Sequence, residues 1–118
     1  MVANKKLLIA LDYDGTFTAD PEMWIDVIKK MQARGHEVVI ATMRTPEELD
    51  EIDPRLIDSH VRIVPTSRRA KVPYLSAFEL VPDIWIDDQP LYLYTNCAER
   101  LPADPEFDMV LSIREGRA

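Results

Sequence analysis

The sequence has a single cysteine, Cys97, and no apolar run near the roughly 20 residues that a membrane-spanning helix needs. One cysteine cannot form an internal disulfide, which suits a reducing compartment, so we expect a cytoplasmic protein with no membrane partner. His36 and His60 lie far apart and Cys97 has no partner motif, so nothing favours zinc. Basic residues are outnumbered by acidic ones, 14 Lys and Arg against 21 Asp and Glu. The net charge of −7 argues against a nucleic-acid coat and against binding to anionic membranes, since both rely on basic surface.

The composition, 47% hydrophobic and 30% charged residues, is typical of a globular protein. From the length we expect one domain that spans residues 1–118. Short apolar runs predict strands at 6–11, 37–42, 61–64 and 83–87, and an edge strand at 109–113. Helices are expected at 21–34, at 71–80, and in a short segment that starts after Thr45 and stops before Pro54. Residues 91–94 are left open as a strand, a loop or a short helix.

Strands that alternate with helices predict an α/β fold, a three-layer doubly wound (Rossmann-like) parallel sheet of about five strands. In such sheets, functional groups collect at the carboxyl ends of the strands. Polar residues do follow the predicted strands or begin the helix before the fourth: Asp12, Asp14, Thr42, Arg44, Lys71, Asp87 and Asp88. Converging carboxylates repel one another unless a cation neutralises them, and Mg²⁺ is the hard cation that suits oxygen ligands.

These residues resemble the four motifs of the haloacid dehalogenase (HAD) superfamily. The resemblance rests on DYDGT at 12–16, Thr42 after a strand, Lys71, and IDD at 86–88, in that order along the chain. It implies an Mg²⁺-dependent phosphatase in which Asp12 attacks phosphorus and Asp14 acts as general acid and then base. The second of these carboxylates favours phosphatase chemistry within the family.

The resemblance also assigns the remaining site residues. Its magnesium ligands are Asp12, the main-chain carbonyl of Asp14, Asp87, and Asp88 directly or through water. Thr42 is expected to bond a phosphoryl oxygen, and Lys71 to neutralise charge on the phosphoryl group. Gly15, Thr16 and Arg44 are expected to bind substrate.

Four neighbouring residues allow further predictions. For Arg44, a contact with phosphate or with a second acidic group is weighed equally against an exposed surface position. Arg68 and Arg69 are interpreted as a solvated loop in preference to a basic rim. Tyr13 is expected to face away from the metal.

Cap domains of this family are inserted after the first motif or between the second and third, and neither gap is long enough here. We therefore expect a capless member with an open site. Its phosphorylated substrate would be macromolecular, a nucleic-acid end or a phosphoprotein, or else a small metabolite enclosed by a second subunit of a homo-oligomer. The alternatives left open are a phosphotransferase of the same family and a non-catalytic module that binds phosphate, a nucleotide or a partner protein.

Overall fold

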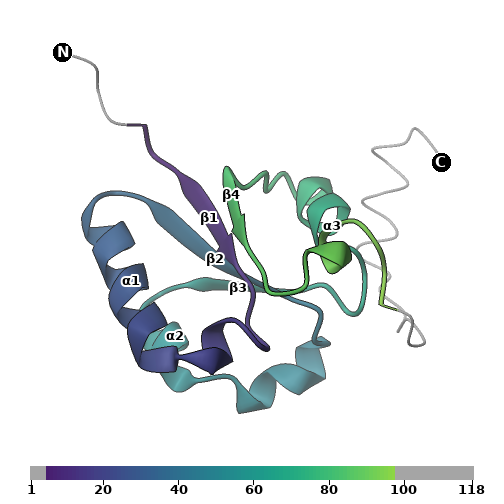
Figure 1. Ribbon diagram of the computed structural model, residues 1–118, viewed down its shortest axis with the longest axis horizontal. Helices are drawn as coiled ribbons and strands as arrows, with labels where there is room; N and C mark the ends of the chain where they lie inside the picture. Colours follow the sequence, from purple (N-terminus) through teal and green to yellow (C-terminus); the bar gives the residue numbers. More distant parts are fainter. Residues whose placement is uncertain (1–4, 98–118) are drawn as a thin grey trace.

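The computed structural model describes residues 5–97, and a four-stranded parallel sheet lies at its centre (Figure 1). The strands are β1 (Leu8–Leu11), β2 (Glu37–Thr42), β3 (Arg62–Pro65) and β4 (Ile84–Ile86), in the order β3-β2-β1-β4. The α/β class and the parallel sheet are confirmed. Residues 5–97 contribute four strands, and the fifth predicted strand, 109–113, lies outside the described residues.

Within residues 5–97, three α-helices and three 3₁₀-helices connect and cover the strands. They are α1 (Pro21–Ala33), α2 (Pro54–Asp58), α3 (Lys71–Ala77), η1 (Phe17–Ala19), η2 (Pro46–Glu51) and η3 (Pro90–Leu93). The segment after Thr45 is a 3₁₀-helix that ends before Pro54, and residues 91–94 fall mostly in η3, a short helix. The sequence did not predict α2. The third predicted helix ends earlier than expected, at Ala77.

Both faces of the sheet are covered, which gives the three layers (Figure 1). On one face, β1 and β2 pack with α1 and α2 through a cluster that includes Ile9, Leu11, Ile25, Ile28, Val38, Ile40 and Leu56. On the other face, the strands pack with α3 through Ala10, Val39, Ala41, Val64, Tyr74, Leu75 and Ala77. Alternate residues of each strand belong to opposite clusters, as expected for strands buried on both sides.

The first helix begins and ends where its sequence indicates. The Asp20 side chain accepts a hydrogen bond from the Met23 N–H at 3.2 Å, and Pro21 is the first helical residue. Beyond the helix, Gly35 has a φ of +87°, the left-handed conformation that commonly follows a helix end. The next residue, His36, accepts the Leu7 N–H through Nδ1, a contact within the fold.

The order in which strands are added to the sheet reverses between β1 and β4, although all four strands are parallel. The chain runs outward from β1 through β2 to β3 and then returns to form β4 on the other side of β1. In open α/β sheets, ligands bind at such a reversal, outside the carboxyl ends of the strands. Between β1 and β4 the chain forms η1, α1, β2, η2, α2, β3 and α3. No helix in that range is long and apolar enough to span a membrane.

Candidate active site

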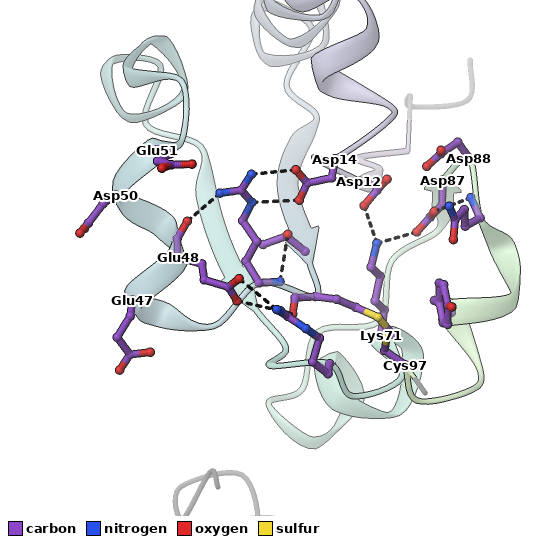
Figure 2. A pocket seen from close by; sticks show the side chains of 16 residues that line it. Asp12, Asp14, Glu47, Glu48, Asp50, Glu51, Lys71, Asp87, Asp88 and Cys97 are labelled. Atoms are coloured by element: carbon purple, nitrogen blue, oxygen red, sulfur yellow. Dashed lines mark hydrogen bonds and ion pairs between the residues drawn. The ribbon is translucent and has the colours of Figure 1, made fainter. Parts of the chain in front are cut away.

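A buried lysine joins two aspartates at the carboxyl ends of β1 and β4. Lys71 begins α3, and its Nζ lies 2.6 Å from Asp12 Oδ1 and 2.7 Å from Asp87 Oδ2 (Figure 2). The Lys71 side chain is only 3% exposed. Asp12 directly follows β1, and its N–H bonds to the Ile86 carbonyl of β4, so the backbone ties the two strand ends together. Three segments distant in the sequence therefore meet at one point.

The environment of Asp12 favours its neutral form more than water does. Burial raises the pKa of Asp12 to about 6, against the opposing effect of the nearby Lys71 ammonium. A carboxylate with this pKa is still mostly ionised at neutral pH. Because it is poorly hydrated and has a cation beside it, it is suited to attack an electrophile.

Thr16 connects the two carboxylate-bearing loops. Its hydroxyl lies 3.1 Å from both Asp12 Oδ2 and Asp88 Oδ1, and it accepts the Asp88 N–H at 3.1 Å. Gly15 makes room for this arrangement, because a Cβ atom at residue 15 would overlap the Asp88 carboxylate. The Gly15 N–H donates to Thr18 Oγ1 at 2.9 Å. Gly15 therefore bonds to Thr18, and Thr16 bonds to Asp12 and Asp88.

One group of carboxylates has the spacing of a metal site. Single oxygens of Asp12, Asp87 and Asp88 lie within 4.8 Å of one another. These are hard oxygen donors from two strand ends, the type that Mg²⁺ takes from proteins, so the donor set fits the predicted ion. The Asp14 carboxylate is not part of this group. Its main-chain carbonyl remains a predicted ligand.

Thr42 lies at the end of β2 and is buried. Its Oγ1 accepts the Arg44 N–H at 3.3 Å, which leaves the hydroxyl hydrogen able to donate. Arg44 in turn reaches Asp14 with two hydrogen bonds, 2.9 Å from Nε and 2.8 Å from Nη2. The prediction that Arg44 contacts a second acidic group is therefore confirmed, and Asp14 raises the pKa of the guanidinium.

Arg68 and Glu48 form a second arginine–carboxylate pair. Arg68 donates to both oxygens of Glu48, at 2.7 and 2.9 Å, and to the Met43 carbonyl at 2.7 Å. Its hydrogen bonds lower the pKa of Glu48 to about 2, with help from the Thr45 N–H. The interpretation of Arg68 as part of a solvated loop is wrong. Its backbone has a φ of 68°, and its N–H bonds to the Met43 carbonyl, so the loop folds back onto the end of β2.

Most of these side chains line one open cleft (Figure 2). Among the predicted site residues it includes Asp12, Asp14, Thr42, Arg44, Lys71, Asp87 and Asp88. Gly15 and Thr16, which were expected to bind substrate, are not among its lining residues. The sequence analysis missed the acidic residues of η2 that form one side of the cleft: Glu47, Glu48, Asp50 and Glu51. It also missed Met43, Gln89, Tyr92 and Cys97 as lining residues. Their only signal was closeness to the motifs along the chain.

Tyr13 packs on the far side of its motif. It is buried, stacks on Phe17 with ring centroids 5.4 Å apart, and accepts the Asp53 N–H at 2.9 Å through its hydroxyl. It belongs to the core cluster on the α1 side of the sheet and is not among the residues that line the cleft. Its ring also lies beneath the Arg44 guanidinium, 5.3 Å from the centroid.

Comparison with known protein families gives one match. The family model of haloacid dehalogenase-like hydrolases matches residues 9–61, from β1 to the start of β3. This segment contains the DYDGT motif and Thr42. Lys71, Asp87 and Asp88 lie beyond it in the sequence, and in the structure Lys71 contacts Asp12 and Asp87. Neither the curated proteins nor the solved structures give a significant match.

Proposed function

Because this chain belongs to the haloacid dehalogenase superfamily of hydrolases, we propose that it is an Mg²⁺-dependent phosphomonoester hydrolase with Asp12 as its nucleophile. The observation that carries the proposal is the buried contact of Lys71 with Asp12 and Asp87, at 2.6 and 2.7 Å. This contact brings two carboxylates and a cation together where the strand ends converge, which supports the proposed role of Asp12. Phosphoryl transfer needs this kind of positioning and charge stabilisation.

In the proposed reaction, an Asp12 oxygen forms a bond to phosphorus while the bond from phosphorus to the leaving oxygen breaks. Asp14 gives its proton to that leaving oxygen, and the alcohol departs. In the second half, Asp14 takes a proton from water, the water oxygen attacks phosphorus, and the bond to Asp12 breaks to release phosphate. One difficult displacement is thereby split into two easier ones.

The other residues of the proposed site hold the phosphoryl group, balance its charge or position the carboxylates. The Thr42 hydroxyl donates to a non-bridging oxygen, and the Lys71 ammonium stabilises charge that builds up near Asp12. Thr16, through its contacts with Asp12 and Asp88, keeps the two carboxylates in register. Gly15 leaves the space that the Asp88 side chain occupies. Asp12, Asp87 and Asp88 would hold Mg²⁺, which neutralises the phosphoryl oxygens when bound.

The charges of the cleft favour one class of substrate. Four acidic residues of η2 line the side of the cleft across from Lys71 (Figure 2). Such a wall repels the backbone of a nucleic-acid end, whose neighbouring phosphates would lie beside it. We therefore favour a small phosphorylated metabolite or a phosphorylated protein side chain over a polynucleotide.

The proposal is tested by release of phosphate from p-nitrophenyl phosphate and a panel of alkyl phosphates, with and without Mg²⁺. We expect wild-type hydrolysis that stops when the metal is chelated, and no detectable turnover by Asp12→Asn. Asp26→Asn makes the same chemical change on an exposed residue of α1 and should keep the wild-type rate.

Two results would contradict the proposal. Equal rates from wild type and Asp12→Asn would show that Asp12 is not the nucleophile. An inactive wild-type protein that still binds phosphate would favour the non-catalytic module. Adding methanol as a competing acceptor separates hydrolysis from phosphotransfer, because a phosphotransferase would form methyl phosphate in preference to free phosphate.

A further inference from the structure

Asp14, the proposed acid and base, is directed away from the nucleophile. Both of its oxygens accept hydrogen bonds from the Arg44 guanidinium, at 2.8 and 2.9 Å. Figure 2 shows the Asp14 carboxylate turned toward this arginine, while the Asp12 carboxylate is turned toward Lys71. Two parallel hydrogen bonds of this kind are among the strongest and most specific contacts a carboxylate makes.

The guanidinium is the fixed member of this pair. Arg44 Nη1 donates to the Glu48 carbonyl at 2.8 Å, and the Tyr13 ring lies 5.3 Å beneath the guanidinium carbon. The Arg44 side chain is 21% exposed, whereas that of Asp14 is 54% exposed. Asp14 is therefore the member that can turn without breaking other contacts.

This pairing has a consequence for the reaction. A carboxyl oxygen that gives a proton to a leaving group must face that group, but both Asp14 oxygens face Arg44. The pair must open before Asp14 can act. A second oxyanion in the cleft can replace Asp14 on the guanidinium, because phosphate and carboxylate oxygens match the same pair of donors.

We infer that Arg44 is a positioning residue that exchanges Asp14 for an oxyanion of the substrate, so that Asp14 becomes free for acid–base work only when the cleft is filled. The inference rests on the role proposed above for Asp14. The exchange itself moves no proton, since the guanidinium stays charged throughout; the released Asp14 carboxylate then takes up a proton from water before it acts as the acid. The oxyanion is either the phosphoryl group itself or a second anionic group beside it. The substrate class is then a phosphomonoester that presents an oxyanion to Arg44.

A double-mutant cycle on ligand binding tests this exchange without any turnover. Calorimetry in Mg²⁺ buffer would measure the affinity of methylphosphonate, which has one anionic group, and of phosphonoacetate, which has two. The proteins are wild type, Asp14→Asn, Arg44→Gln and the double variant. Removing the competing carboxylate should tighten binding about fivefold or more in the wild-type background and less than about twofold in the Arg44→Gln background.

Glu47→Gln is the matched control, because it removes a carboxylate from the same cleft. It should tighten binding equally with and without Arg44, through general electrostatics alone. Coupling with methylphosphonate identifies the phosphoryl oxygens as the exchanging group, and coupling with phosphonoacetate alone identifies the second anion. If neither ligand shows coupling, or if Asp14→Asn acts equally in both backgrounds, the inference is overturned. Coupling in a protein without phosphatase turnover would count against the proposed function only.

Discussion

The Asp88 carboxylate occupies the space that a side chain at residue 15 would fill. A Cβ atom on Gly15 would overlap Asp88 Oδ2, and the φ of +86° at Gly15 is one that other residues adopt only with strain. We predict that Gly15→Ala lowers the free energy of unfolding by about 1–3 kcal/mol. It should also weaken Mg²⁺ binding, because Asp88 must move. Urea unfolding with and without Mg²⁺ measures both effects.

Gly35→Ala is the control for this variant. Gly35 has a similar φ of +87°, but nothing lies within 4 Å of a Cβ atom there. It should lose stability through backbone strain alone and keep the full stabilisation by Mg²⁺. If Gly15→Ala keeps that stabilisation too, Asp88 does not contribute to the metal site.

The Lys71 ammonium hydrogen-bonds both Asp12 and Asp87. Lys71→Met would leave two buried carboxylates without their shared partner, and breaking a buried pair costs about 3–5 kcal/mol. We predict a large loss of stability that Mg²⁺ partly reverses, since the ion can replace the missing charge. Thermal unfolding across an Mg²⁺ titration would show it.

Lys5→Met provides the comparison, because it removes an ion pair with Asp83 that is 3.0 Å long but has a 72% exposed lysine. Exposed pairs contribute about 0–1 kcal/mol, so little should change. Equal destabilisation by the two variants, or no response of Lys71→Met to Mg²⁺, would contradict this account of Lys71.

Glu48 should make stability depend on pH. Its folded pKa of about 2 lies below the ordinary value of 4.5, because Arg68 and the Thr45 N–H stabilise the charged form. Stability from this group is therefore present above pH 4.5 and is lost as the pH falls toward 2. We predict that Glu48→Gln lowers stability at pH 7 by about 1 kcal/mol, a value discounted for solvent exposure. Urea unfolding at several pH values should show the difference from wild type shrinking below pH 4.5. A difference that does not vary with pH would show that the charge is not involved.

Asp14→Asn should separate the two halves of the reaction. A p-nitrophenolate leaving group needs little help from an acid, so Asp12 should still be phosphorylated, whereas hydrolysis of the intermediate loses its base. We predict a burst of one p-nitrophenolate per protein and then turnover slowed by about 10²–10⁴-fold. Alkyl phosphates should give no burst. Rapid-mixing absorbance resolves the phases, and a steady rate equal to that of wild type would exclude Asp14 as the base.

Most of the sheet could be predicted because its strands are short apolar runs that end at polar residues. Glu37–Thr42 has the predicted bounds, and the other three described strands differ by a residue or two at their ends. The helix Pro54–Asp58 could not be predicted from periodicity, because its five residues bury only Leu56. A signal was nonetheless present, since Asp53 followed by Pro54 repeats the cap at Asp20 and Pro21.

The convergence of Asp12, Lys71 and Asp87 was predictable because parallel strands bring their carboxyl ends to one edge. The pairing of Arg68 with Glu48 was not. It depends on a loop in which Ser67 and Arg68 adopt φ values of 54° and 68°, and neither residue type signals this conformation. The ion pair between Arg44 and Asp14 likewise depends on how the loops after β1 and β2 lie in space. The spacing of the two residues along the sequence does not specify this.

The account depends most on the capture of phosphorus by Asp12. Acid quenching during turnover with Mg²⁺ and a phosphoester, followed by mass spectrometry of the peptide that contains Asp12, tests it directly. We predict one added phosphoryl group on this peptide in wild type, more of it in Asp14→Asn, and none in Asp12→Asn. Mg²⁺-dependent hydrolysis with no phosphorylated peptide, and at the same rate in Asp12→Asn, would contradict the account.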